Sequence, residues 1–140
     1  MTVGRPCEVQ SCALPYRVQD GDKVEVLLIT TRRTGRWSLP KGKISRGLSF
    51  AASAAKEAYE EAGVLGEIGS MSFASFRKTK RMEDGRKHVI EVWVYPLKVT
   101  RCLPHWPEQG QRDLRWCSRD EALVLLQDGR FGDAVRLLRC

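Results

Sequence analysis

Three glutamates, Glu57, Glu60 and Glu61, lie close together in a stretch that is rich in alanine, glutamate and lysine. In a helix, their i, i+3 and i+4 spacing places all three on one face. Like charges on one face repel each other, whereas a hard divalent cation such as Mg²⁺ or Mn²⁺ would turn that repulsion into binding. The spacing therefore indicates a metal-binding helix, and a solvated acidic helix is the alternative interpretation.

The segment just before this stretch places a glycine between two lysines, Lys41-Gly42-Lys43. Glycine permits close backbone approach, so its carbonyl can face a cation, and lysines hold phosphate oxygens as point charges. Hydrolysis of a phosphoanhydride needs both kinds of group. A metal neutralises the pyrophosphate and activates water, a carboxylate takes the proton, and cations stabilise the leaving phosphate. The two segments together favour that chemistry.

The elements that must position these residues follow from propensity and hydrophobic pattern. A helix is predicted over residues 50–62, with Ser49 as its N-cap and Gly63 just beyond its end. Alanines on the face opposite the glutamates would let this helix lie close to a sheet. Strands are predicted over residues 7–17, 23–31, 37–39, 71–79, 88–99 and 113–118, loops over 41–47 and 103–111, and helices over 119–128 and 131–139. The alternation predicts a mixed α/β domain.

The stretch from Gly42 to Val64 resembles the Nudix box, G-x5-E-x7-R-E-U-x-E-E-x-G-U, where U is a bulky aliphatic residue. Six positions match the box, namely Gly42, Glu57, Glu60, Glu61, Gly63 and Val64. Three depart from it, because Leu48 holds the first glutamate position, Lys56 the arginine position and Ala58 the first aliphatic position. Within the family, the first glutamate and the arginine are thought to pair and brace the loop against the helix. Since both have changed together here, the departures indicate a replaced brace rather than a destroyed metal site.

The resemblance covers most of the chain. Within the family, the chain is similar to the diphosphoinositol polyphosphate and diadenosine polyphosphate hydrolase branch. The resemblance implies a Nudix α/β/α sandwich with a central mixed β-sheet, and residues 1–140 as one domain. It also implies a Mg²⁺-dependent pyrophosphohydrolase, with Mn²⁺ as a possible substitute. The substrate would be a nucleoside or dinucleoside polyphosphate, or a diphosphoinositol-polyphosphate-like compound. The alternative is a non-catalytic Nudix module that binds a phosphorylated ligand or an RNA end.

The resemblance also assigns roles to residues. The metal would be held by Glu57, Glu60 and Glu61 and by the carbonyl of Gly42, and Glu57 and Glu60 are the catalytic candidates. Family members differ in their general base, which is either the box position that Glu57 occupies or an acid from a later loop. Glu57 is preferred here, with Glu83 and Glu91 as the other candidates.

Lysine and arginine outnumber aspartate and glutamate by 24 to 17, which gives a net charge of +7. Two clusters, in residues 32–46 and 77–87, would form a basic rim for a highly phosphorylated ligand if they flank the metal helix. The substrate-binding candidates from them are Arg32, Arg36, Lys41, Lys43 and Lys78. Solvated loops are the alternative. No aromatic residues interleave with the basic ones to stack bases, which argues against a nucleic-acid partner.

The composition narrows the class further. The chain has 140 residues, of which 42% are hydrophobic, and no apolar run long enough for a membrane span. The first ten residues lack the apolar segment of a secretory signal. Five cysteines without a Cys-x-x-Cys pair, and only two histidines, argue against a structural zinc site and are typical of reduced thiols in the cytoplasm. Nothing in the sequence indicates an oligomeric state.

Overall fold

The two longest strands, β1 (Glu8–Gln19) and β7 (Lys87–Cys102), form the centre of the sheet in the computed structural model, which describes Pro6 and residues 8–140. They run parallel, in register from Glu8 opposite Ile90 to Tyr16 opposite Lys98. Strand β2 (Lys23–Thr30) pairs with the other edge of β1, while β5 (Val64–Ile68) and β6 (Ala74–Arg81) pair with β7. These last three pairings are antiparallel, so the sheet is mixed, as predicted.

Three short strands complete the eight-stranded sheet. Strands β3 (Trp37–Ser38) and β8 (Leu114–Ser118) pair with β2, and β4 (Lys41–Lys43) pairs with β1. Strand β4 corrects the predicted loop over 41–47, and β5 was not predicted at all. Both are short, and their partners lie far away in the sequence. The predicted strand over 7–17 is observed as Glu8–Gln19, and Cys7 lies outside the described residues.

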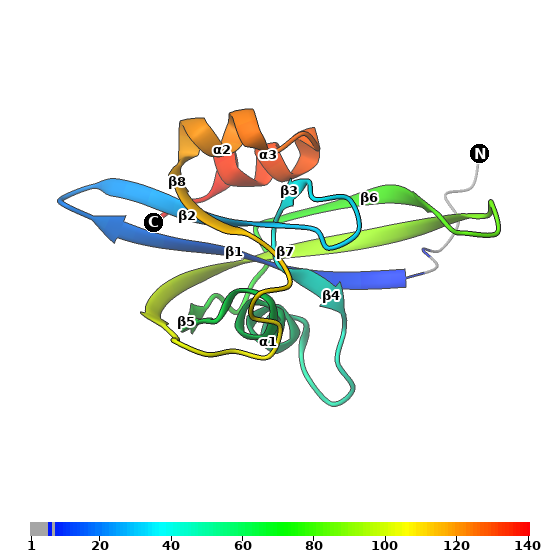
Figure 1. The fold of residues 1–140 in the computed structure, drawn as a ribbon, viewed down its shortest axis with the longest axis horizontal. Helices are drawn as coiled ribbons and strands as arrows, with labels where there is room; N and C mark the ends of the chain where they lie inside the picture. The colour runs from blue at the N-terminus through cyan, green and yellow to red at the C-terminus, as the bar shows by residue number, and fades with distance from the viewer. Residues whose placement is uncertain (1–5, 7) are drawn as a thin grey trace.

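Helices cover both faces of the sheet (Figure 1). Helix α1 (Phe50–Ala62) packs on one face, against Leu27 and Ile29 of β2. Helices α2 (Arg119–Leu125) and α3 (Gly129–Leu137) pack on the other, against Val26 and Leu28. Strand β2 is hydrophobic at consecutive positions because both of its faces are covered. The predicted α/β/α sandwich is therefore confirmed.

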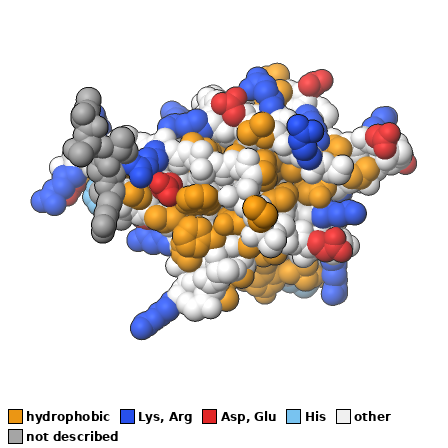
Figure 2. All heavy atoms as spheres, turned by 180° about the vertical axis from the view of Figure 1, so that it is seen from behind, with side chains coloured by type: hydrophobic (Ala, Val, Ile, Leu, Met, Phe, Trp, Pro, Cys, Tyr) orange, Lys and Arg blue, Asp and Glu red, His pale blue; other side chains and the backbone are white. Residues whose placement is uncertain are grey.

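The surface of the molecule carries the excess of basic side chains. Viewed from behind, lysine and arginine side chains project around the margin, while hydrophobic side chains gather nearer the centre (Figure 2). Among the described residues, no helix is both long enough and apolar enough to span a membrane.

Candidate active site

Helix α1 begins and ends where the sequence predicted. The Ser49 hydroxyl accepts the N–H of Ala52 at 3.0 Å, and Gly63 ends the helix with a φ of 66° and an N–H that donates to the Tyr59 carbonyl. Ala54, Ala58 and Ala62 are buried against the sheet. These small side chains let the helix backbone lie close to the strands, so that the glutamates stand at the edge of the sheet.

Glu61 is the most enclosed of the three glutamates, at 7% exposure. Burial raises the pKa of its carboxyl to about 7, and the charge of Glu57 adds to that rise. Two contacts act in the opposite direction. The backbone N–H of Lys41 donates to Oε1 at 3.2 Å, and the Arg112 guanidinium lies 3.7 Å from Oε2. The site therefore holds a carboxylate whose charge is only partly compensated by the protein.

Glu57 lies directly against Gly42. A Cβ atom at position 42 would overlap the Glu57 carboxyl group, so a larger residue there would have to push that group aside. Burial raises the pKa of Glu57, and Glu60 raises it further. The structure thus brings together Gly42, Glu57 and Glu61, which come from β4 and from two successive turns of α1.

Glu60 is placed differently from the other two glutamates. Its Oε1 forms an ion pair with Lys56 Nζ at 3.0 Å, and the same ammonium group donates to the Ser45 hydroxyl at 3.1 Å. The spacing of the three glutamates predicted one repelling cluster. Lys56, four residues before Glu60, instead neutralises part of that charge.

Two charged residues near the site were not predicted. Glu108 and Arg112 lie in the loop between β7 and β8, where the Arg112 guanidinium contacts the Glu108 carboxylate at 2.6 Å. The Arg112 side chain is only 7% exposed, and its Nε has no hydrogen-bond partner among the described residues. A signal for Glu108 was available, since it is the only acid in the predicted loop over 103–111 and some family members use a later-loop acid. Arg112 had no such signal.

The loop that carries Glu108 and Arg112 is held against helix α1. The Trp106 ring packs so tightly over Gly63 that a Cβ there would overlap it. The N–H of Leu103 donates to the Gly63 carbonyl at 2.8 Å, and the N–H of Glu108 donates to the Glu60 carbonyl at 3.0 Å. The end of α1 thus positions the Glu108 carboxylate and the Arg112 guanidinium beside Glu57 and Glu61.

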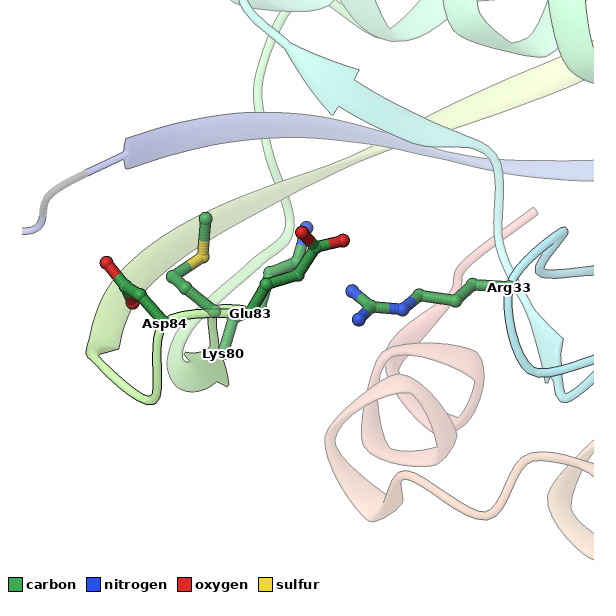
Figure 3. A pocket seen from close by; sticks show the side chains of 5 residues that line it. Arg33, Lys80, Glu83 and Asp84 are labelled. Carbon is green, nitrogen blue, oxygen red and sulfur yellow. The ribbon is translucent and has the colours of Figure 1, made fainter.

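The other two base candidates lie in different surroundings. Glu91, on β7, accepts hydrogen bonds from Arg77 Nε at 3.1 Å and from Trp93 Nε1 at 2.8 Å, so both of its oxygens have partners. Glu83 lies between β6 and β7 and lines a hollow of about 400 Å³ with Arg33 and Lys80 (Figure 3). In the described part of the chain, neither Glu83 nor Glu91 forms a hydrogen bond or an ion pair with Gly42, Glu57 or Glu61.

The structure brings two of the five basic candidates together and places the other three elsewhere. Lys41 and Lys78 converge on the Phe131 ring, with their Nζ atoms 5.5 and 5.4 Å from its centroid. Burial lowers the pKa of Lys78, and the Lys41 charge lowers it further. Arg32 lies on the other side, 3.8 Å from Glu108. Lys43 is exposed and pairs with Glu8 at 3.7 Å, while Arg36 is exposed beside the Thr31–Gly35 turn.

Comparison with known proteins identifies the family. The profile of the NUDIX domain matches residues 12–139, and the chain belongs to the Nudix family. Nudix proteins are hydrolases of pyrophosphate bonds and generally depend on divalent metals.

Individual relatives agree with this assignment. Nudix hydrolase 21, chloroplastic, from Arabidopsis thaliana is 33% identical over 91% of this chain and 64% of its own length. Diphosphoinositol polyphosphate phosphohydrolase 2 from Rattus norvegicus is 30% identical over 84% of this chain and 62% of its own. The chain thus spans less than two thirds of either relative. An Ap4A hydrolase from C. elegans has the same fold, with a TM-score of 0.65, 18% identity and coverage of 92% of this chain and 93% of its own.

The acidic residues fit a divalent cation by their chemistry. Within the described part of the chain, no three Asp, Glu, His or Cys side chains are already grouped as a metal site. Half-buried Glu57, which touches Gly42, and buried Glu61 are nevertheless carboxyl groups with raised pKa values. A bound cation would offset both the burial and the repulsion, and carboxylates are the ligands that Mg²⁺ and Mn²⁺ prefer.

Proposed function

We propose that the chain is a Mg²⁺-dependent pyrophosphohydrolase, with Mn²⁺ as a possible substitute. It cleaves a phosphoanhydride bond in a nucleoside or dinucleoside polyphosphate or in a diphosphoinositol-polyphosphate-like substrate. The observation that carries this proposal is the pair of carboxyl groups on α1, half-buried Glu57 and buried Glu61, that meets Lys41 and Gly42 of β4 inside the Nudix box. The names of the rat phosphohydrolase and the nematode hydrolase support the substrate class. A cytoplasmic location and a single domain over residues 1–140 stay predictions.

The placement of these residues supports the roles that we propose for them. Glu57, Glu61 and the Gly42 carbonyl would hold the metal, which when bound neutralises the phosphates and acidifies water. Glu60 keeps its predicted place among the ligands and candidate acids, but its ion pair with Lys56 makes it the least available of the three.

Glu57 accepts the proton of the attacking water in the proposed mechanism. The new O–P bond forms as the bridging P–O bond of the anhydride breaks, and the leaving phosphate departs with its electron pair. As a carboxylate within the site, Glu57 can take this proton directly. Lys41, Lys78 and Arg32 bind the phosphates on either side and stabilise the charge that develops on the leaving group.

Hydrolysis of a substrate panel tests the proposal. Hydrolysis of ATP, GTP, diadenosine polyphosphates, ADP-ribose and a diphosphoinositol phosphate is measured with Mg²⁺, with Mn²⁺ and with EDTA, as phosphate that a coupled pyrophosphatase or phosphatase releases from the products. We expect metal-dependent release from one class, and a loss of at least about 100-fold in Glu61→Gln. The matched control is Glu67→Gln, at an exposed glutamate on β5, which retains full activity.

The same panel decides between this function and the alternative. If the folded protein binds these compounds but hydrolyses none of them, the chain is a non-catalytic Nudix module. Full turnover in Glu61→Gln would refute the metal-site assignment.

A further inference from the structure

The segment between β4 and α1 is tied to the helix by a chain of serines. The N–H of Ser45 donates to the hydroxyl of Ser53 at 3.0 Å, and Ser53 is completely buried. The N–H of Ser53 in turn donates to the carbonyl of Ser49 at 2.9 Å. The segment therefore follows the first turns of α1 closely.

Lys56 closes this arrangement from the solvent side. Its Nζ contacts both the Ser45 hydroxyl, at 3.1 Å, and Glu60 Oε1, at 3.0 Å. An ammonium group has three donors and can serve two acceptors at once. Leu48 offers no acceptor to Lys56, and its side chain is partly exposed. The ionic pair of the Nudix box is thus absent at its usual positions, and Lys56 uses two other acceptors.

We propose that Ser45 and Lys56 are positioning residues that hold the Gly42 segment against Glu57, with Glu60 as the anchor of Lys56. This inference rests on the proposed metal dependence. Gly42 already touches the Glu57 carboxyl group, and only two residues separate Gly42 from Ser45. A shift of Ser45 therefore moves the Gly42 carbonyl relative to Glu57 and Glu61, the groups assigned to the metal.

Hydrogen exchange of the metal-free full chain tests whether the Ser45–Lys56 contact, here called the brace, holds the Gly42 segment. This test makes no reference to activity. The reporters are the amides of Ser45 and Leu48, which are hydrogen-bonded to Ser53 Oγ and to the Ser45 carbonyl. In Lys56→Met we expect these amides to exchange at least about 5-fold faster, while the amide of the central-strand residue Val92 is unchanged. The matched control is Arg136→Met, which removes an exposed helix ion pair of the same 3.0 Å length, to Asp133, and leaves all three amides unchanged.

Mn²⁺ affinity, measured by calorimetric titration, tests the functional consequence. Ser45→Ala is expected to weaken Mn²⁺ binding about 3- to 10-fold. Lys56→Met is expected to weaken it by less, because that change also releases Glu60, and Lys56→Arg is expected to retain wild-type affinity. The double variant is expected to be no weaker than the worse single variant, because both changes remove the same contact.

Each outcome has a defined meaning. Unchanged exchange and affinity in both single variants, or fully additive losses in the double variant, would overturn the brace. If the wild type binds no Mn²⁺, or Glu61→Gln binds it equally well, the proposed function fails instead. The exchange rates of Ser45 and Leu48 then still decide whether Lys56 holds the segment.

Discussion

Glu61 gives the candidate site a pH dependence of stability. Burial raises the pKa of its carboxyl to about 7, above the usual 4.5. Between these pH values the folded protein retains a proton that the unfolded chain has released, so the folded state loses stability as the pH rises. In EDTA, the free energy of unfolding of the wild type should decrease from pH 5 to pH 8 by roughly 3 kcal/mol relative to Glu61→Gln. Urea unfolding at both pH values measures this, and parallel profiles would contradict it.

Gly42 is the residue at which one added carbon most directly disturbs the proposed metal site. In Gly42→Ala, the new Cβ must displace the Glu57 carboxyl group, the end of a flexible side chain. We expect a stability loss of at most about 1 kcal/mol and a fall in turnover of more than about tenfold. Gly129→Ala is the control, since a Cβ at position 129 meets no atom within 4 Å. Thermal unfolding and steady-state kinetics of the two variants make the comparison. Equal behaviour would show that the contact with Glu57 is unimportant.

At the scale of elements, the junction of α1 with the β7–β8 loop depends on Gly63. This glycine has a left-handed backbone and also lies under the Trp106 ring. Gly35 has nearly the same φ, 68° against 66°, but has open space around it. Both Gly→Ala variants place an alanine in a strained left-handed conformation. Only Gly63→Ala must also displace Trp106. We therefore expect Gly63→Ala to be less stable than Gly35→Ala by about 1–3 kcal/mol in urea unfolding. We also expect the fluorescence of Trp106 in Gly63→Ala to become less shielded from solvent. Equal losses would contradict the packing role.

The local signals of helix α1 made it predictable. Its composition, Ser49 at its start and Gly63 at its end act within a few residues of one another, and the observed bounds match. The two missed strands show the opposite case. Strand β4 exists because Lys41–Lys43 meets Gln10–Cys12, and β5 because it meets the end of β7. Such pairings depend on the topology of the whole sheet, and no short-range pattern encodes them.

The same distinction divides the candidate site. The glutamates and Gly42 belong to one continuous motif, so their spacing was sufficient to find them. The Lys56–Glu60 pair was equally local, and its i, i+4 spacing was sufficient to predict it. Arg112 reaches Glu61 from a loop that packs on Gly63 through Trp106, a long-range contact that has no periodicity in the sequence.

At the scale of the whole molecule, the net charge of +7 should favour polyanionic substrates, and Lys78 should contribute directly. In Lys78→Met, removal of the partly buried ammonium group beside Lys41 is expected to raise KM about tenfold with little change in kcat. The effect should shrink as salt increases, because screening weakens the wild type more than the variant. Lys23→Met, at the exposed start of β2, is the control. Steady-state kinetics at two ionic strengths measure both, and a loss confined to kcat would argue against phosphate binding.

The parallel pairing of β1 with β7 also has a consequence for how the protein comes into being. During synthesis, β1 leaves the ribosome well before residues Ile90–Lys98, its central neighbour, exist. Pairings between such distant segments close large loops and slow the search for the native topology. The strand that carries Gly42 pairs with β1, so the site can reach its final geometry only after β7 has joined β1.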